Sequence, residues 1–223
     1  MRLAFAALLS LLPLNAAADP VVVELFTSQG CSSCPPADEM LGELAERGDV
    51  IALSLHVDYW DWIGWADTFA DPAHTARQRA YAAAAGSTVV YTPQFVIGGA
   101  TQIAGPRGMK LMEAVRAHQD ATGDVLGVDD AGRLTLAETG APARLILATV
   151  LPEAEVAIGR GENAGRVFRY HRIVRDWQVL GEWDGAAGTM TLPEAPEGLQ
   201  RVVLAQRMLG AYPGPYLGAV AVD

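Results

Sequence analysis

Residues 21–38 have the sequence VVVELFTSQGCSSCPPAD. The run from Val21 to Phe26 is short, apolar and β-branched, which predicts a buried strand. A polar loop follows, and Pro35 and Pro36 favour the first turn of a helix, where a missing N–H breaks no internal bond. Apolar residues then recur at three-to-four spacing as far as Ala45. The stretch therefore predicts a strand, a loop with a Cys-x-x-Cys motif and a helix.

The sequence on either side of this helix extends the pattern. Residues 50–57 form a second apolar strand, so the first two strands should be parallel in a right-handed βαβ unit. Further along, the sequence predicts an aromatic-rich segment at 58–69, a helix that starts at Asp71-Pro72 and ends at Gly86, an antiparallel hairpin at 94–105 and a helix at 109–116. The order βαβα followed by ββα indicates an α/β fold and resembles that of thioredoxin-like proteins.

Beyond Gly123 the pattern changes to short apolar runs separated by glycine, proline and charged residues. Such spacing is typical of an all-β domain, and we expect a smaller, sandwich-like one. The predicted organisation is a signal peptide at 1–18, a thioredoxin-like domain at 19–122 with an inserted aromatic and helical segment at 58–86, and a β-rich domain at 123–223.

The first eighteen residues have the features of a secretory signal. Arg2 precedes an apolar run from Leu3 to Leu14, and Ala16-Ala17-Ala18 supplies a small-residue cleavage site before Asp19. Cleavage would change the net charge from −10 to −11, because Arg2 is the only charged residue removed. We expect a periplasmic or secreted protein that does not insert into the membrane, because no later apolar run reaches the roughly 20 residues of a spanning helix. We expect no nucleic-acid binding either, because the acidic surface repels phosphate backbones as it repels anionic lipid.

Cys31 and Cys34 are the two cysteines of the chain. A loop closed over two residues removes little entropy from the unfolded chain, so a purely structural disulfide is a poor explanation. At a helix N-terminus the first thiol is exposed to free N–H groups and the positive end of the dipole, which lower its pKa. Cys31 is the expected attacking thiolate and Cys34 the resolving thiol. Ser32 and Ser33 add no positive charge, so we expect a middling potential, and no cofactor beyond the redox-active disulfide.

Two further features resemble thioredoxin-fold proteins. Thr92-Pro93 resembles the loop that places a cis-proline beside the cysteine pair, where the residue before proline offers backbone hydrogen bonds to an extended substrate. Glu24 is the only charged residue in its strand. The resemblance implies a buried acid that relays protons to the inner cysteine. The other interpretation is a strand-edge glutamate that points into water.

The stretches ELFTSQGCSSCPPAD at 24–38, HVDYWD at 56–61 and GPYLGA at 214–219 resemble DUF1223, a family of secreted bacterial proteins of unknown function. The resemblance covers nearly the whole mature chain. It implies a thioredoxin-like fold with an appended β domain, and it implies no established substrate.

The sequence leaves three functions open. The first is a thiol–disulfide oxidoreductase acting on envelope proteins or small thiols through an unknown redox partner, with Trp60, Trp62 and Trp65 lining a client groove over the cysteine pair. The second is a Cu(I)-binding protein in which His56 joins the two thiolates. The third is a non-catalytic binding module with an inert disulfide. The tryptophans could equally be part of the core.

Overall fold

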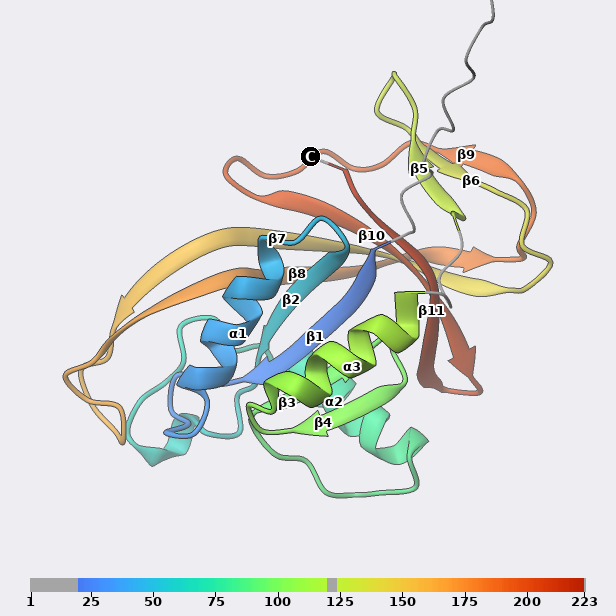
Figure 1. Ribbon diagram of the computed structural model, residues 1–223. Coiled ribbons are helices and arrows are strands. Elements are labelled where there is room, and N and C mark those ends of the chain that lie inside the picture. Colours follow the sequence, from blue (N-terminus) through green and yellow to red (C-terminus); the bar gives the residue numbers. More distant parts are fainter. Residues whose placement is uncertain (1–19, 120–123, 223) are drawn as a thin grey trace, which may run out of the picture.

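The structure, a computed structural model, describes residues 20–119 and 124–222 (Figure 1). The fold is mixed α/β, with one large central sheet and three α-helices among the described residues. The eight strands of this sheet lie in the order β11-β10-β7-β8-β2-β1-β3-β4. The predicted signal peptide and the predicted boundary at 122–123 fall outside the described residues. None of the helices described here is long and apolar enough to span a membrane.

The elements before residue 120 follow the sequence prediction closely. β1 (Val21–Thr27) is parallel to β2 (Val50–His56), and α1 (Pro35–Ala45) connects them. A 3-10 helix, η1 (Asp61–Ile63), lies in the aromatic segment, and Asp71 caps α2 (Pro72–Ala84) by accepting from the Ala73 N–H. β3 (Gln94–Ile97) and β4 (Thr101–Ala104) form the expected hairpin, followed by α3 (Gly108–Gln119).

The region after residue 123 is strand-rich, as predicted, but its long strands do not form a sandwich of their own. β7 (Ala143–Ala157), β8 (Val167–Trp183), β10 (Gln200–Leu209) and β11 (Tyr212–Ala221) all belong to the central sheet. β8 lies parallel to β2, with Ile173 paired to Ser54. Main-chain groups at the free edge of β2 need partners, and β8 supplies them. The prediction of a sandwich is therefore wrong for these strands.

The central sheet buries both of its faces. On one face, alternate residues of β1 such as Val23 and Leu25 pack with Leu41 of α1 and Val115 of α3. On the other, Val22 and Phe26 pack with Tyr81 of α2 and with residues from β7, β8, β10 and β11. We call these the α1 face and the α2 face. The sheet curls around the α2 face, so that the edge strand β11 approaches the end of β3. There the Tyr216 N–H of β11 donates to the carbonyl of Gly98, the residue that follows β3.

A small second sheet covers part of the strand-rich region. It consists of β5 (Leu126–Val128), β6 (Leu134–Leu136) and β9 (Gly188–Met190) in the order β5-β6-β9. Leu126 and Leu134 of this sheet pack on Leu145 and Leu147 of β7 and on Val203 of β10. Two-layer packing of strands is thus present, but only between this small sheet and the end of the large one.

Candidate functional site

Cys31 and Cys34 form a disulfide at the junction between β1 and α1. The Cα atoms of the two cysteines are 5.4 Å apart. Cys34 is the N-cap of α1, and its N–H donates to the Cys31 carbonyl at 3.3 Å, so Cys31 occupies the turn before the helix. Ser32 and Ser33 are exposed, whereas Cys31 is only 3% exposed and Cys34 is fully buried. Of the two sulfur-bearing residues, Cys31 is therefore the one nearer to solvent.

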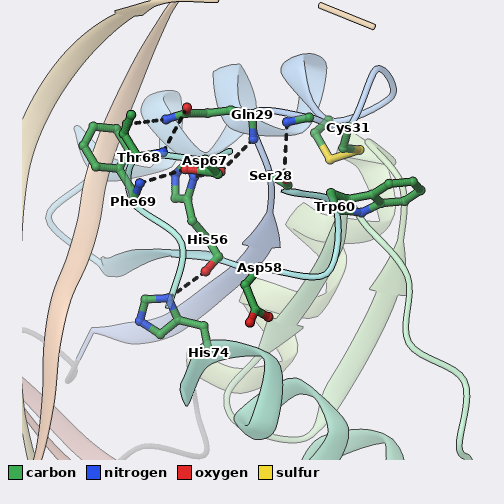
Figure 2. Close-up of polar contacts among 12 residues, drawn as sticks. Ser28, Gln29, Cys31, His56, Asp58, Trp60, Asp67, Thr68, Phe69 and His74 are labelled. Carbon is green, nitrogen blue, oxygen red and sulfur yellow. Dashed lines mark hydrogen bonds and ion pairs between the residues drawn. A yellow bond between two sulfur atoms is a disulfide. The ribbon is translucent and has the colours of Figure 1, made fainter. Parts of the chain in front are cut away.

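The loop before Cys31 is held by a network centred on Gln29 (Figure 2). The Gln29 N–H donates to Asp67 Oδ2 at 2.8 Å, and its side-chain oxygen accepts from Trp65 Nε1 at 2.8 Å. From the loop between β7 and β8, Asn163 Nδ2 donates to the Gln29 carbonyl at 2.9 Å and to the Cys31 carbonyl at 3.1 Å. Buried backbone groups of the loop are thus satisfied by side chains from distant segments, which fixes the main chain that carries Cys31.

The aromatic segment lies against this loop, but its three tryptophans have different surroundings. Trp60 is half-buried beside the cysteine pair, and a side chain at Gly30 would place its Cβ 3.4 Å from Trp60 Cβ (Figure 2). Trp62 is 81% exposed. Trp65 is bonded to Gln29 and packs on the β7–β8 loop near Gly161. The predicted groove of three tryptophans therefore has one member beside the disulfide, one facing solvent and one that ties two segments together.

The predicted proline loop is connected to the cysteine loop through Trp60. The Thr92–Pro93 peptide bond is cis. The Thr92 hydroxyl accepts from Trp60 Nε1 at 2.7 Å, and Trp60 in turn packs on Gly30. The structure thus brings Thr92, Trp60 and the residue before Cys31 into one connected set.

Glu24 does not belong to this set. Its carboxylate is fully buried on the α2 face, where it accepts from Arg77 Nε at 2.5 Å, from the Tyr81 hydroxyl at 2.5 Å and from the Tyr216 hydroxyl at 2.7 Å. The charge of Glu24 holds the pKa of Arg77 above its usual range, although burial of the guanidinium opposes this. The interpretation of Glu24 as a strand-edge glutamate that points into water is wrong, because its side chain is fully buried. Its role as a proton relay stays a prediction.

Sequence reasoning missed a buried acid–imidazole cluster on the α1 face. His56, at the end of β2, contacts Asp67 Oδ2 through Nδ1 at 2.7 Å, and both side chains are fully buried (Figure 2). Burial alone would raise the pKa of Asp67, but His56 and two backbone N–H donors hold that pKa below its usual value. Asp38 of α1 is also buried, and desolvation raises its pKa to about 7 against the opposing effect of His56.

Asp38 could have been recognised from its spacing. It comes four residues after Cys34 and three before Leu41, so it falls on the apolar stripe of α1 and not on its solvent face. Asp67 carries no comparable signal, because it lies in an irregular segment eleven residues after His56. Within residues 20–119 and 124–222, no group of three or more His, Cys, Asp or Glu side chains suits a metal ion.

Comparison with known proteins identifies the family. The family model described as "Protein of unknown function (DUF1223)" matches residues 22–206. The chain belongs to this family. An Agrobacterium tumefaciens protein solved by X-ray crystallography is 33% identical to this DUF1223 chain, with a TM-score of 0.81 over 92% of this chain and 94% of that one. A search of curated proteins gives no match.

A second solved structure shares the fold at lower identity. HBP35 of Porphyromonas gingivalis is 14% identical, with a TM-score of 0.53 over 92% of this chain and 74% of that chain. At this identity the likeness concerns the fold alone. The DUF1223 architecture described above is thus found in the Agrobacterium tumefaciens protein at family level and, more distantly, in HBP35.

Proposed function

We propose that this protein is a thiol–disulfide oxidoreductase with a thioredoxin-like core, exported to the periplasm or secreted. The observation that carries the proposal is the Cys31–Cys34 disulfide at the end of a central strand and the start of α1. A helix N-terminus stabilises a thiolate formed next to it, and i, i+3 spacing lets the second thiol attack the first. The site can therefore pass two electrons between its own dithiol and another disulfide.

The strand order supports a thioredoxin-like core. β2, β1, β3 and β4 are adjacent, with β1 parallel to β2 and antiparallel to β3. α1 and α3 cover one face and α2 covers the other. The Cys-x-x-Cys follows the central strand β1, and the cis Thr92–Pro93 bond precedes β3, which pairs with β1.

Exposed apolar side chains in the two segments joined by Trp60 favour a partner with apolar character. Trp62 is exposed, and Val89 in the loop before Thr92 is 66% exposed. Trp60 links their two segments through its hydrogen bond to Thr92. Aromatic side chains contribute strongly to binding where a partner covers them. We infer that extended segments of envelope proteins, or small thiols, reach Cys31 along this surface.

The function is tested with single cysteine variants. In the reduced protein Cys31 should be alkylated well below pH ~8 while Cys34 stays protected. Cys31→Ser should abolish reduction of insulin disulfides, and Cys34→Ser should accumulate mixed disulfides. Equal and slow alkylation of both thiols would overturn the proposal in favour of an inert disulfide. Stoichiometric Cu(I) uptake that is lost in His56→Ala would overturn it in favour of copper binding.

The direction of the reaction depends on the potential of the pair. Ser32 and Ser33 offer no positive charge to the Cys31 thiolate, so the helix end is the main stabilising influence. We expect a potential between those of strong reductants and strong oxidants, measured by equilibrium with glutathione. Export is tested separately, since the intact mass of the exported protein should correspond to a chain that begins at Asp19.

A further inference from the structure

Four buried polar side chains gather on the α1 face, near the end of β1 that leads into the cysteine loop. Thr27 follows Leu25 on the same side of β1, while Ser54 and His56 follow Ala52 on the same side of β2, and Leu25 and Ala52 both pack in the α1-face core. Asp38 projects from α1 on the apolar stripe that covers this face. All four are buried, with exposures from 0% to 6%.

This cluster holds most of the unsatisfied buried polar atoms found among the described residues. Six buried side-chain atoms have no hydrogen-bond partner there, and four of them are Thr27 Oγ1, Asp38 Oδ1, Ser54 Oγ and His56 Nε2. Buried polar groups in folded proteins nearly always find a partner, because leaving one unpaired destabilises the fold. Four in one place indicate a site with a chemical task.

Asp38 lies one helical turn below Cys34. The Asp38 N–H donates to the Cys34 carbonyl at 3.1 Å. Residues four apart share one side of a helix, and the Cα–Cβ bond leans toward the helix N-terminus, so the Asp38 side chain leans toward the turn of Cys34. Cys34 is fully buried. After reduction of the disulfide, its thiol would need a nearby group to take its proton.

Charged and titratable groups from three elements surround the Asp38 carboxyl. Burial raises its pKa to about 7. His56 on β2 and the Thr27 hydroxyl on β1 act against this, while Asp67 and the neighbouring Glu39 act with it. From β8, the Tyr170 ring packs edge-on against His56 at 4.9 Å between ring centroids. At neutral pH the carboxyl is accordingly divided between its acid and its base form.

A cavity of about 180 Å³ gives Asp38 a route to solvent. It lies between the start of α1 and the first part of β8. Its other lining residues are Pro35, Glu39, Val167, Phe168, Arg169 and His171. Trp60 and Thr92, which flank the cysteine pair, are absent from this lining. A proton could therefore leave Asp38 without passing through the surface that a substrate would cover.

We propose that Asp38 accepts the proton of Cys34 when the mixed disulfide is resolved, and that this proton reaches water through the α1–β8 cavity. The inference rests on the proposed oxidoreductase function. In the step, the Cys34 S–H bond breaks and the proton passes to the Asp38 carboxylate. The Cys34 sulfur attacks Cys31 Sγ, the Cys31–Cys34 bond forms, the bond from Cys31 to the substrate sulfur breaks, and the electron pair leaves on the substrate thiolate.

The two half-reactions can be timed separately with 5,5′-dithiobis(2-nitrobenzoate). When the reduced mature protein is mixed with this disulfide, attack by Cys31 releases one coloured thiolate and resolution by Cys34 releases the second. In Asp38→Asn the first release should keep its rate. The second should slow about tenfold or more near pH ~7, the size expected for loss of a positioned base. The difference should shrink above pH ~9, where thiols ionise without help.

The matched control is Glu43→Gln, an exposed carboxylate further along the same helix and outside the lining of the cavity, which should leave both rates unchanged. An unchanged second rate in folded Asp38→Asn would overturn the role of Asp38 while leaving the oxidoreductase proposal intact. Absence of the first release in the unmodified protein would overturn both.

A measurement on the unmodified protein guards against failure of the variant to fold. The ¹³C carboxyl resonances of aspartate in the reduced protein should include one that titrates near neutrality. If every aspartate carboxyl titrates below pH ~5, the proposal is wrong.

Discussion

Glu24 and Asp38 are buried carboxylic acids on opposite faces of one sheet, and they are accommodated in different ways. On the α2 face, Glu24 is bound by Arg77 and by two tyrosine hydroxyls. On the α1 face, Asp38 keeps one oxygen without a partner, and desolvation raises its pKa to about 7. A buried charge must be paired or must be able to become neutral. The pairing of Glu24 suits a structural role, and the unpaired state of Asp38 suits proton transfer.

The comparison predicts the largest loss of stability for substitution of Arg77, the partner of Glu24. Arg77→Met should destabilise the protein by about 4 kcal/mol, because it leaves the Glu24 charge buried without its counter-ion. Urea unfolding at neutral pH measures the loss. Arg207→Met, which removes an exposed arginine from β10, should change stability by less than about 0.5 kcal/mol. If both variants behave alike, the Glu24 pair contributes nothing particular to the α2 face.

Removing the charge of Asp38 should stabilise the protein, whereas removing the charge of Arg77 should destabilise it. The pKa of Asp38 in the folded protein is about 7, above the usual value near 3.8. The folded state therefore holds this proton more tightly than the unfolded state does, so the stabilising contribution is complete below pH ~4 and is lost as the pH rises through ~7. At pH ~8 Asp38→Asn, which stays neutral, should be more stable than the unmodified protein by about 4 kcal/mol, the value of a shift of about three pKa units.

Urea midpoints for Asp38→Asn should therefore coincide with those of the unmodified protein at pH ~4 and separate progressively up to pH ~8. Glu43→Gln provides the baseline, since this exposed carboxylate of α1 should give no such divergence. Equal stability of Asp38→Asn and the unmodified protein at both pH values would show that Asp38 is no less well accommodated than Glu24.

The tryptophans sharpen the same contrast between structural and functional positions. Trp60 packs on the α2-face core and bonds Thr92, so Trp60→Ala should cost about 2 kcal/mol of stability. Trp62 is exposed, and Trp62→Ala should leave the melting temperature unchanged. Under the proposed function it should nevertheless weaken capture of an apolar peptide by Cys34→Ser. Normal capture by Trp62→Ala would remove Trp62 from the client surface.

The smallest effect concerns a single donor to Glu24. Tyr216→Phe removes one of the hydroxyls that donate to the Glu24 carboxylate but leaves Arg77 and Tyr81 in place. We expect a loss of about 1 kcal/mol in urea unfolding. Tyr212→Phe, a half-exposed tyrosine on the same strand, is the matched variant and should have no effect. Equal changes in the free energy of unfolding for the two variants would mean that the Tyr216 hydroxyl contributes little to the stability of the α2 face.

Local patterns explain what the sequence predicted well. The dipeptide Asp71-Pro72 predicts both the cap and the first residue of α2, because the capping side chain and the rigid proline act within one turn. The apolar runs of β1 and β2, the Cys-x-x-Cys and the hairpin at 94–105 are equally local. Each depends on neighbours in sequence, and the structure places each of them as predicted.

Long-range pairing explains what was missed. Short apolar runs after residue 123 predict strands, but nothing in them indicates that β8 pairs with β2. The ion pair of Glu24 joins residues 53 positions apart, so its partner could not be chosen from the sequence. Asp38 was readable as a carboxylate on an apolar stripe, whereas its neighbours His56 and Asp67 meet it only after the sheet has formed.

The two hydrogen bonds from Asn163 to the main chain of the cysteine loop have a consequence for biosynthesis. The donor lies 134 and 132 residues after its acceptors, Gln29 and Cys31. A nascent chain that has emerged only as far as α3 carries both cysteines but lacks the residue that fixes their loop, and lacks β8, the neighbour of β2. Ordering of the cysteine loop must therefore wait until the β7–β8 hairpin has been synthesised and has joined the sheet. Until then, the thiols are available to oxidants on a loop that has not reached its final shape.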